Sequence, residues 1–160
     1  MSHVLVPLAQ GCEELEAITI TDLLVRAGID VTTCGLDDRP VKASRGTTII
    51  PDTSIDKVLD QSFDLIVLPG GLPGADHLRD NAAVQTLIRK QAEKGGYLAA
   101  ICAAPKALAQ AGVLDGRTAT ASPGTLPALN NDHISISDLS LIHISEPTRR
   151  RDSSRKPSSA

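Results

Sequence analysis

The chain has 160 residues, 41% of them hydrophobic, and its only two aromatic side chains are Phe63 and Tyr97, so the core of a single domain must be aliphatic. A net charge of −3 gives no basic surface for binding nucleic acid. No apolar run reaches the about 18 residues that a membrane span needs, and no signal-like leader opens the chain. Three cysteines without metal-ligand spacing fit neither a disulfide framework nor a zinc site. We therefore expect a cytoplasmic domain with reduced thiols.

Strand-like and helix-like segments alternate along the chain. The predicted strands cover residues 3–7, 29–34, 47–51, 64–68 and 97–101, and the predicted helices cover 13–27, 54–60, 82–94 and 103–111. This alternation predicts an α/β domain with a doubly wound, mostly parallel sheet and helices on both faces. Ligands bind such sheets at the carboxyl ends of the strands, where Gly11, the pair Gly70–Gly71 and Cys102 are expected.

The last part of the chain departs from this pattern. Residues 139–149 and the Arg/Ser/Lys/Pro stretch after them resemble the translation of a sequencing-library adapter. We expect an α/β domain over residues 1–138 that is incomplete at its C-terminus, and a non-native or disordered tail over residues 139–160. A basic tail that binds an acidic partner is the alternative. We assign no function to His143 or Arg149–Arg151.

Cys102 is the main candidate nucleophile. It follows an apolar strand and precedes a helix in which Pro105 fits the first turn. A cysteine at such a turn faces the positive end of a helix dipole, which favours the thiolate. Its neighbours are small, as a sharp nucleophile turn requires. A buried, inert cysteine at a strand end is the competing interpretation.

Gly70 and Gly71 end the strand before Cys102, where backbone amides can point into a cleft and stabilise an oxyanion or a thiolate. A loop that only requires positive φ is the competing interpretation.

Residues 11–16 carry three carboxylates at a helix start, which usually complement the helix dipole. Glu16 lies between Leu15 and Ala17 and can instead point inward, where a protonated carboxyl would donate to a thiolate.

The other cysteines and the histidines have weaker interpretations. Cys34 ends an apolar strand and is expected in the core, whereas Cys12 is expected in an exposed loop that is open to oxidation. A Cys-His pair would need His77 or His133 to approach Cys102 through the fold.

Five segments together resemble the DJ-1/ThiJ/PfpI superfamily, specifically its DJ-1/YajL branch. They are residues 11–18, 22–28, 43–46, 64–71 and 99–105, and the likeness extends over roughly residues 3–130. The resemblance implies a flavodoxin-like fold, a homodimer, and no metal or organic cofactor. It maps the family's reactive cysteine onto Cys102 and its protonated glutamate partner onto Glu16. The implied anion pocket comprises Gly70, Gly71 and Ala103, and the residues implied around the site or at the dimer interface are Glu13, Arg26 and Arg45.

The activity implied by the resemblance is that of a cysteine-dependent protein deglycase and glutathione-independent glyoxalase. Its substrates would be 2-oxoaldehydes and their early adducts, with nucleic acid at most a glycated substrate, and its role would lie in oxidative or carbonyl stress. The alternative is a non-enzymatic redox sensor or redox-regulated chaperone that uses the same cysteine.

The sequence also departs from its relatives. Ser122 stands where many of them have a histidine, and the family continues beyond Asp138 with a Gly-Pro-Gly turn and a closing helix. A PfpI-type peptidase expects a histidine directly after the nucleophile, where Ala103 stands. An amidotransferase-like hydrolase expects glycines on both sides of the cysteine, where Ile101 and Ala103 stand.

Overall fold

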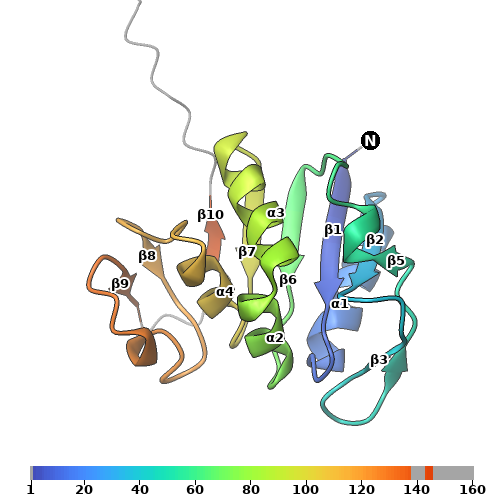
Figure 1. Cartoon of the computed structure of the whole chain (residues 1–160), viewed down its shortest axis with the longest axis horizontal. Helices are drawn as coiled ribbons and strands as arrows, with labels where there is room; N and C mark the ends of the chain where they lie inside the picture. The colour runs from blue at the N-terminus through green and yellow to red at the C-terminus, as the bar shows by residue number, and fades with distance from the viewer. Residues whose placement is uncertain (1, 138–142, 146–160) are drawn as a thin grey trace, which may run out of the picture.

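A computed structural model describes residues 2–137 and 143–145. Its main feature is a six-stranded sheet in the order β10-β7-β6-β1-β2-β5 (Figure 1). The strands, in that order, are β10 (His143–Ser145), β7 (Tyr97–Ala100), β6 (Leu65–Leu68), β1 (His3–Leu8), β2 (Asp30–Gly35) and β5 (Thr53–Ser54). All neighbouring pairs are parallel except β10 with β7.

The chain winds outward from β1 to β2 and β5, then returns to β6 on the other side of β1. The strand order therefore reverses between β1 and β6, which is where flavodoxin-like folds bind their ligands. This topology confirms the predicted doubly wound α/β fold.

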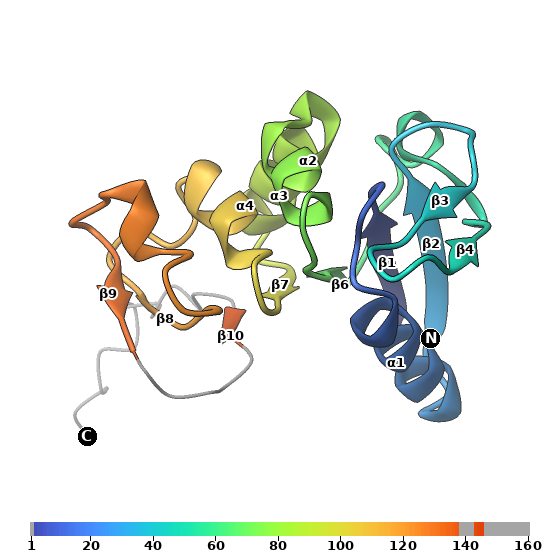
Figure 2. The same cartoon turned by 90° about the horizontal axis from the view of Figure 1, so that it is seen from below.

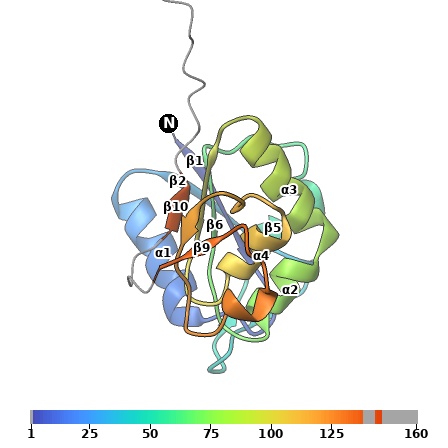
Figure 3. The same ribbon diagram turned by 90° about the vertical axis from the view of Figure 1, so that its left-hand side faces the viewer.

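Helices cover both faces of the sheet, as predicted (Figures 2 and 3). One face carries α1 (Glu14–Arg26), and the other carries α2 (Gly74–Asp80), α3 (Ala82–Glu93) and α4 (Pro105–Gln110). None of the helices within residues 2–137 has the length and apolar character needed to cross a membrane.

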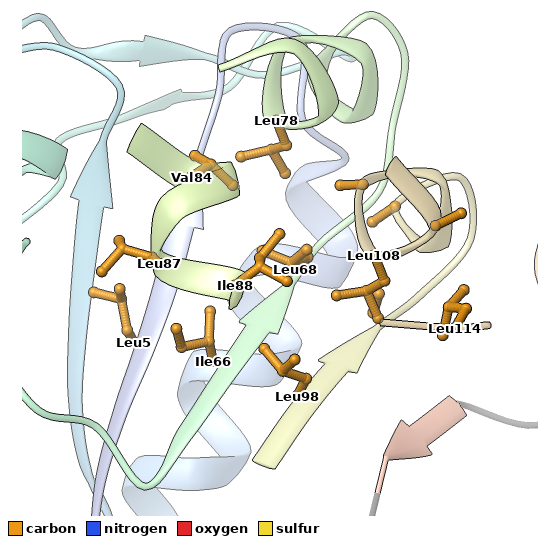
Figure 4. Packing of buried hydrophobic residues seen from close by; sticks show 14 of the residues in the cluster. Leu5, Ile66, Leu68, Leu78, Val84, Leu87, Ile88, Leu98, Leu108 and Leu114 are labelled. Carbon is orange, nitrogen blue, oxygen red and sulfur yellow. The ribbon is translucent and has the colours of Figure 1, made fainter. Parts of the chain in front are cut away.

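Successive side chains of a strand point to opposite faces, which divides the core in two. Leu5, Ile66, Leu68 and Leu98 pack against the α2–α4 side, where they contact the apolar faces of those helices (Figure 4). On the other face Val4, Val6 and Val67 pack in the cluster that contains Ala17 of α1.

Local signals explain where the helices begin and end. The Asn81 side chain accepts a hydrogen bond from the Val84 amide at 3.0 Å and caps α3. Glu14 and Glu16 lie in the first turn of α1 and Arg26 in its last turn, which suits the helix dipole. Gly28, with φ of 76°, ends α1 in the left-handed conformation.

Three predicted elements differ from the structure. The strand expected at 47–51 is reduced to β4 (Thr48–Ile49), which pairs with β3 (Val41–Lys42) in a separate antiparallel ribbon. The helix expected at 54–60 is a single 3₁₀ turn, Ile55–Lys57, and the Ser54 side chain makes no capping bond. The helix after Cys102 starts only at Pro105, because the residues before it form a turn.

The short elements were not predicted. They are α2, β3, β5, the parallel pair β8 (Thr118–Ala119) and β9 (Ser135–Ile136), and a 3₁₀ turn at Pro127–Leu129. The boundary at residue 138 stays a prediction: three residues beyond it, His143–Ser145, form β10 beside β7, and the other residues of 138–160 lie outside the described part of the chain.

Candidate active site

The segments predicted to carry chemistry meet at the carboxyl edge of the sheet. The loop after β1 contains Gly11 and Cys12, the loop after β6 contains Gly70 and Gly71, and the turn after β7 contains Cys102. The first two loops are hydrogen-bonded to each other, because the Glu13 amide donates to the Gly70 carbonyl at 2.9 Å. The site thus lies at the reversal of strand order between β1 and β6.

Cys102 occupies a strained turn between β7 and α4. Its φ is 58°, and within residues 2–137 only Asn130 is a second non-glycine residue with positive φ. The Ala104 amide closes the turn by donating to the Ile101 carbonyl at 3.0 Å. Non-glycine residues seldom adopt this conformation, and such outliers concentrate at functional sites. The turn leaves Cys102 half-buried, as expected for a nucleophile on a sharp strand-to-helix turn.

Gly70 brings Glu16 and Cys102 together. Its amide donates to the Glu16 Oε2 atom at 2.7 Å, which fixes the carboxyl in the site. A methyl group at Gly70 would lie 2.7 Å from the Cys102 Cβ atom and 2.9 Å from Glu16 Oε2. The two side chains therefore flank the same glycine, and only glycine fits between them. Glu16 is half-buried and points toward this glycine, as the sequence suggested.

The residues predicted to form an anion pocket lie in the loops next to Cys102. Gly71 adopts φ of 88° and packs against the backbone of Cys12 and Glu13, and Ala103 is buried directly after Cys102. Of the three predicted residues, Gly70 has its amide engaged by Glu16, whereas within residues 2–137 the amides of Gly71 and Ala103, and that of Cys102, donate to no protein acceptor. Unengaged amides of this kind can stabilise an oxyanion or a thiolate, and the anion pocket itself stays a prediction.

Glu13 and Arg45 lie at the border of the site. The Glu13 carboxylate accepts a hydrogen bond from Ser44 Oγ at 2.9 Å and lies 4.0 Å from the exposed guanidinium of Arg45. Arg26 lies ten residues beyond Glu16, which is about 15 Å along the helix axis, and pairs with Asp22 at 2.7 Å. The structure therefore brings Glu13 and Arg45 toward the site but not Arg26, and a dimer role for any of them stays a prediction.

Glu14 fastens the start of α1 to the β3–β4 ribbon, a role that the sequence did not indicate. Its carboxylate accepts hydrogen bonds from the amides of Arg45 and Thr47 at 3.0 to 3.2 Å. Desolvation opposes ionisation of this carboxyl, but hydrogen bonds from the backbone of Glu14, Arg45 and Thr47 outweigh it and lower its pKa to about 2. Glu14 thus helps to hold the helix that carries Glu16.

Cys12 and Cys34 are both fully buried. The prediction of an exposed Cys12 is wrong, because the Gly71 and Gly74 backbones pack against it and Ser44 donates to its carbonyl. Burial, followed by the charge of Glu14, raises the pKa of Cys12 to about 11, and burial raises that of Cys34 to about 12. Cys34 belongs to the core, as predicted.

His77 on α2 and His133 before β9 are exposed, and neither is hydrogen-bonded to Cys102.

Ser122 contacts the cysteine turn through its backbone. Its amide donates to the Cys102 carbonyl at 2.7 Å, and its hydroxyl lies 2.7 Å from that of Thr125. The sequence marked Ser122 only as a missing histidine and gave no sign of Thr125. A Ser-Pro-Gly-Thr turn signal was the single feature that could have drawn attention to this segment. Within the described residues, no group of three or more His, Cys, Asp or Glu side chains could hold a metal ion.

The fold and this edge define the class: a flavodoxin-like α/β sandwich centred on a cysteine at a strained strand-to-helix turn. The DJ-1/PfpI family matches residues 2–146, and the chain belongs to that family.

Several known proteins resemble the chain. Protein dj-1beta of Drosophila melanogaster is 45% identical over 139 residues, 86% of this chain and 74% of the relative. Its crystal structure has a TM-score of 0.82 at 46% identity and covers 87% of this chain and 75% of that one. Toxoplasma gondii DJ-1, oxidized, has a TM-score of 0.79 at 34% identity over 86% of this chain and 83% of that one.

A relative with an enzymatic name is the glutathione-independent glyoxalase DJR-1.2 of Caenorhabditis elegans. It is 37% identical over 108 residues, which are 68% of this chain and 58% of the relative. The chain thus spans between 58% and 74% of the length of these two curated relatives.

Proposed function

We propose that this chain is a cysteine-dependent, glutathione-independent glyoxalase and deglycase that acts on 2-oxoaldehydes and their early adducts. The observation that carries the proposal is the placement of Cys102 and Glu16 on either side of Gly70, with Cys102 on a positive-φ turn. The name of the Caenorhabditis elegans relative supports the same chemistry. One nucleophile, one proton shuttle and one set of amides suffice for the reaction.

The first step joins the enzyme and the substrate. The Cys102 thiolate attacks the aldehyde carbon of methylglyoxal, a C–S bond forms, and the carbonyl oxygen takes up a proton to give a hemithioacetal. Amides of Gly71 and Ala103 stabilise the oxyanion that precedes this protonation. Glu16 is suited to supply the proton, because Gly70 occupies only its Oε2 atom and leaves the second oxygen for proton transfer.

The second step is an internal oxidation and reduction. Glu16 removes the proton from the former aldehyde carbon while the ketone oxygen takes up a proton, which gives an enediol. Glu16 then delivers its proton to the neighbouring carbon while the hydroxyl on the sulfur-bearing carbon loses its proton, so that the hemithioacetal becomes a thioester. Water then attacks the thioester, the C–S bond breaks, and lactate and the free thiol are released. The aldehyde carbon is oxidised and the ketone carbon reduced, so no external oxidant is required. On a glycated side chain, the same attack at the adduct carbon would free the amine.

Removal of the Glu16 carboxyl tests this mechanism. Glu16→Ala should lower kcat/KM for methylglyoxal about a hundredfold, because general acid–base groups typically contribute that much. Glu93→Gln, at an exposed position on α3, is the matched control and should turn over normally. Lactate formation is measured under reducing conditions. Unchanged turnover in Glu16→Ala would rule the mechanism out.

A redox sensor or redox-regulated chaperone is the second candidate. A half-buried thiol beside backbone amides can be oxidised by peroxide to a sulfenate and then a sulfinate, with water as the product of each step. The likeness to Toxoplasma gondii DJ-1, whose structure is that of an oxidized form, supports this second candidate. Peroxide-dependent protection of a client protein, without any turnover of methylglyoxal, would support it over the enzyme.

We also propose that the protein forms a homodimer through α1. Leu15, Ile18 and Val25 are 73%, 49% and 60% exposed, and their spacing places them along one stripe of the helix. An apolar stripe of this kind on a surface helix is typical of an interface. Sedimentation velocity should give a dimer for the unsubstituted chain and a monomer for Leu15→Glu, whereas a monomer in both cases would contradict the proposal.

A further inference from the structure

The Cys102 conformation needs support from outside its own turn. A non-glycine residue with φ of 58° returns to negative φ unless its peptide groups are held. On the N-terminal side of Cys102, the Ile101 amide donates to the Leu68 carbonyl at the end of β6, at 3.2 Å, and within the turn the Ala104 amide donates to the Ile101 carbonyl. The carbonyl of Cys102 itself is held from a distant segment by the Ser122 amide, at 2.7 Å.

The segment that supplies this amide is a rigid β-turn. Residues 122–125 read Ser-Pro-Gly-Thr, the Thr125 amide donates to the Ser122 carbonyl at 3.1 Å, and Gly124 has φ of 78°. Proline second and a positive-φ glycine third are the signature of a type II turn. A second bond closes the same turn, since the two hydroxyls at its ends lie 2.7 Å apart. Pro123 restricts the backbone of Ser122, and the two closing bonds hold the carbonyl and the hydroxyl of the residue whose amide binds Cys102.

We propose that the turn Ser122–Thr125 is a positioning clamp for Cys102, which fixes the cysteine carbonyl and so keeps the thiol beside Gly70 and Glu16. Glu16 and Ser122 reach the cysteine turn in different ways. Glu16 is bonded to Gly70, which packs against Cys102, whereas Ser122 is bonded to Cys102 directly. The effect of the clamp on reactivity rests on the proposed function, while its effect on the geometry of Cys102 does not.

Two substitutions weaken the clamp without touching the site. Gly124→Ala strains the turn through its positive φ alone, because an added methyl meets no atom within 4 Å. Gly28→Ala is the matched control, with φ of 76° and equally open space, at the end of α1. Thr125→Val removes the hydroxyl closure, and Thr125→Ser should restore it.

The environment of Cys102 is measured by NMR on protein labelled with ¹³C-cysteine. The signal that disappears in Cys102→Ser is assigned to Cys102. Gly124→Ala and Thr125→Val should shift or broaden the Cys102 resonance and leave Cys12 and Cys34 in place. The rate of Cys102 alkylation at neutral pH should fall about fivefold in both, because a displaced thiol loses the groups that stabilise its thiolate. Thr125→Ser and Gly28→Ala should match the unsubstituted chain in both measurements.

If the Cys102 resonance stayed in place in both Gly124→Ala and Thr125→Val, the clamp would be overturned, whatever the melting temperatures of the two variants. Equal changes at all three cysteines would also overturn it, since they would show general loosening. Failure of the proposed function has a different signature: the unsubstituted chain would not convert methylglyoxal, while the Cys102 resonance would still respond to the clamp variants.

Discussion

Two cysteine-bearing loops lie at the same edge of the sheet and differ in almost every physical respect. Cys12 lies in the loop after β1 and is 0% exposed. Its amide donates to the Ala9 carbonyl, and its carbonyl accepts from the Ser44 amide. Cys102 follows β7 in a positive-φ turn and is half-buried.

The difference supports the proposal that Cys102, and not Cys12, is the reactive thiol. Position at a strand end is common to both residues, so it cannot be the deciding property. Burial and the neighbouring carboxylates raise the pKa of Cys12 to about 11, which keeps it a neutral thiol at physiological pH. At Cys102, the strained turn places the side chain beside a carboxyl that is already hydrogen-bonded to Gly70 and beside unengaged amides.

The largest expected effect comes from substituting Cys102, compared with a separate substitution of Cys12. Cys102→Ser should reduce methylglyoxal turnover to the background rate, because a hydroxyl is a far weaker nucleophile than a thiolate. Cys12→Ala should keep turnover within about twofold, since a buried structural cysteine behaves as a small apolar side chain. Lactate production by both variants is compared at equal folded concentration. A larger loss in Cys12→Ala than in Cys102→Ser would reverse the comparison.

The next effect sharpens the role of the glycine between Glu16 and Cys102. Gly70→Ala should lower kcat/KM about a hundredfold, because its methyl group would displace both flanking groups and misplacement of about 1 Å costs that much. Gly28→Ala is the control, since its methyl group meets nothing within 4 Å and the strain from its φ of 76° falls at the far end of α1. Turnover is assayed well below the melting temperature of both variants. Comparable losses in the two would mean that general destabilisation, and not the site, explains the effect.

The smallest effect concerns the anchor of α1. The pKa of Glu14 in the folded chain is about 2, below its ordinary value of 4.5, so its stabilising contribution is present above about pH 4.5 and is lost as pH falls toward 2. Glu14→Gln should therefore be less stable near neutral pH and should lose less stability on acidification. Thermal unfolding from pH 7 to 2.5 measures this, with Glu93→Gln as the control. Parallel acid profiles for Glu14→Gln and the unsubstituted chain would contradict the assigned hydrogen bonds.

The sequence was informative where elements are long and periodic. The runs that became β1, β2, β6 and β7 and the helices α1 and α3 are long enough for apolar spacing to mark them. The short α2 begins directly after Pro73 and has only seven residues, and β8 and β9 have two residues each, so periodicity could not reveal them.

For the candidate site, the sequence pointed to Cys102, Glu16 and the glycine pair, which the structure places together, but it did not reveal the contacts between distant segments. Glu14 bonds to amides more than thirty residues away, and the Ser122 amide reaches back twenty residues to Cys102. Cys12 was misjudged for the same reason: its loop is covered by the Gly71–Gly74 segment and by Ser44, which only the fold brings near.

The most direct test of the reactive-cysteine assignment is timed alkylation of the native chain at neutral pH, with each cysteine followed by peptide mass spectrometry. We predict that Cys102 is modified first, while Cys12 and Cys34 are modified only as fast as the protein unfolds. Modification of Cys102 no faster than that of the two buried cysteines would contradict the account and leave Cys102 a structural residue.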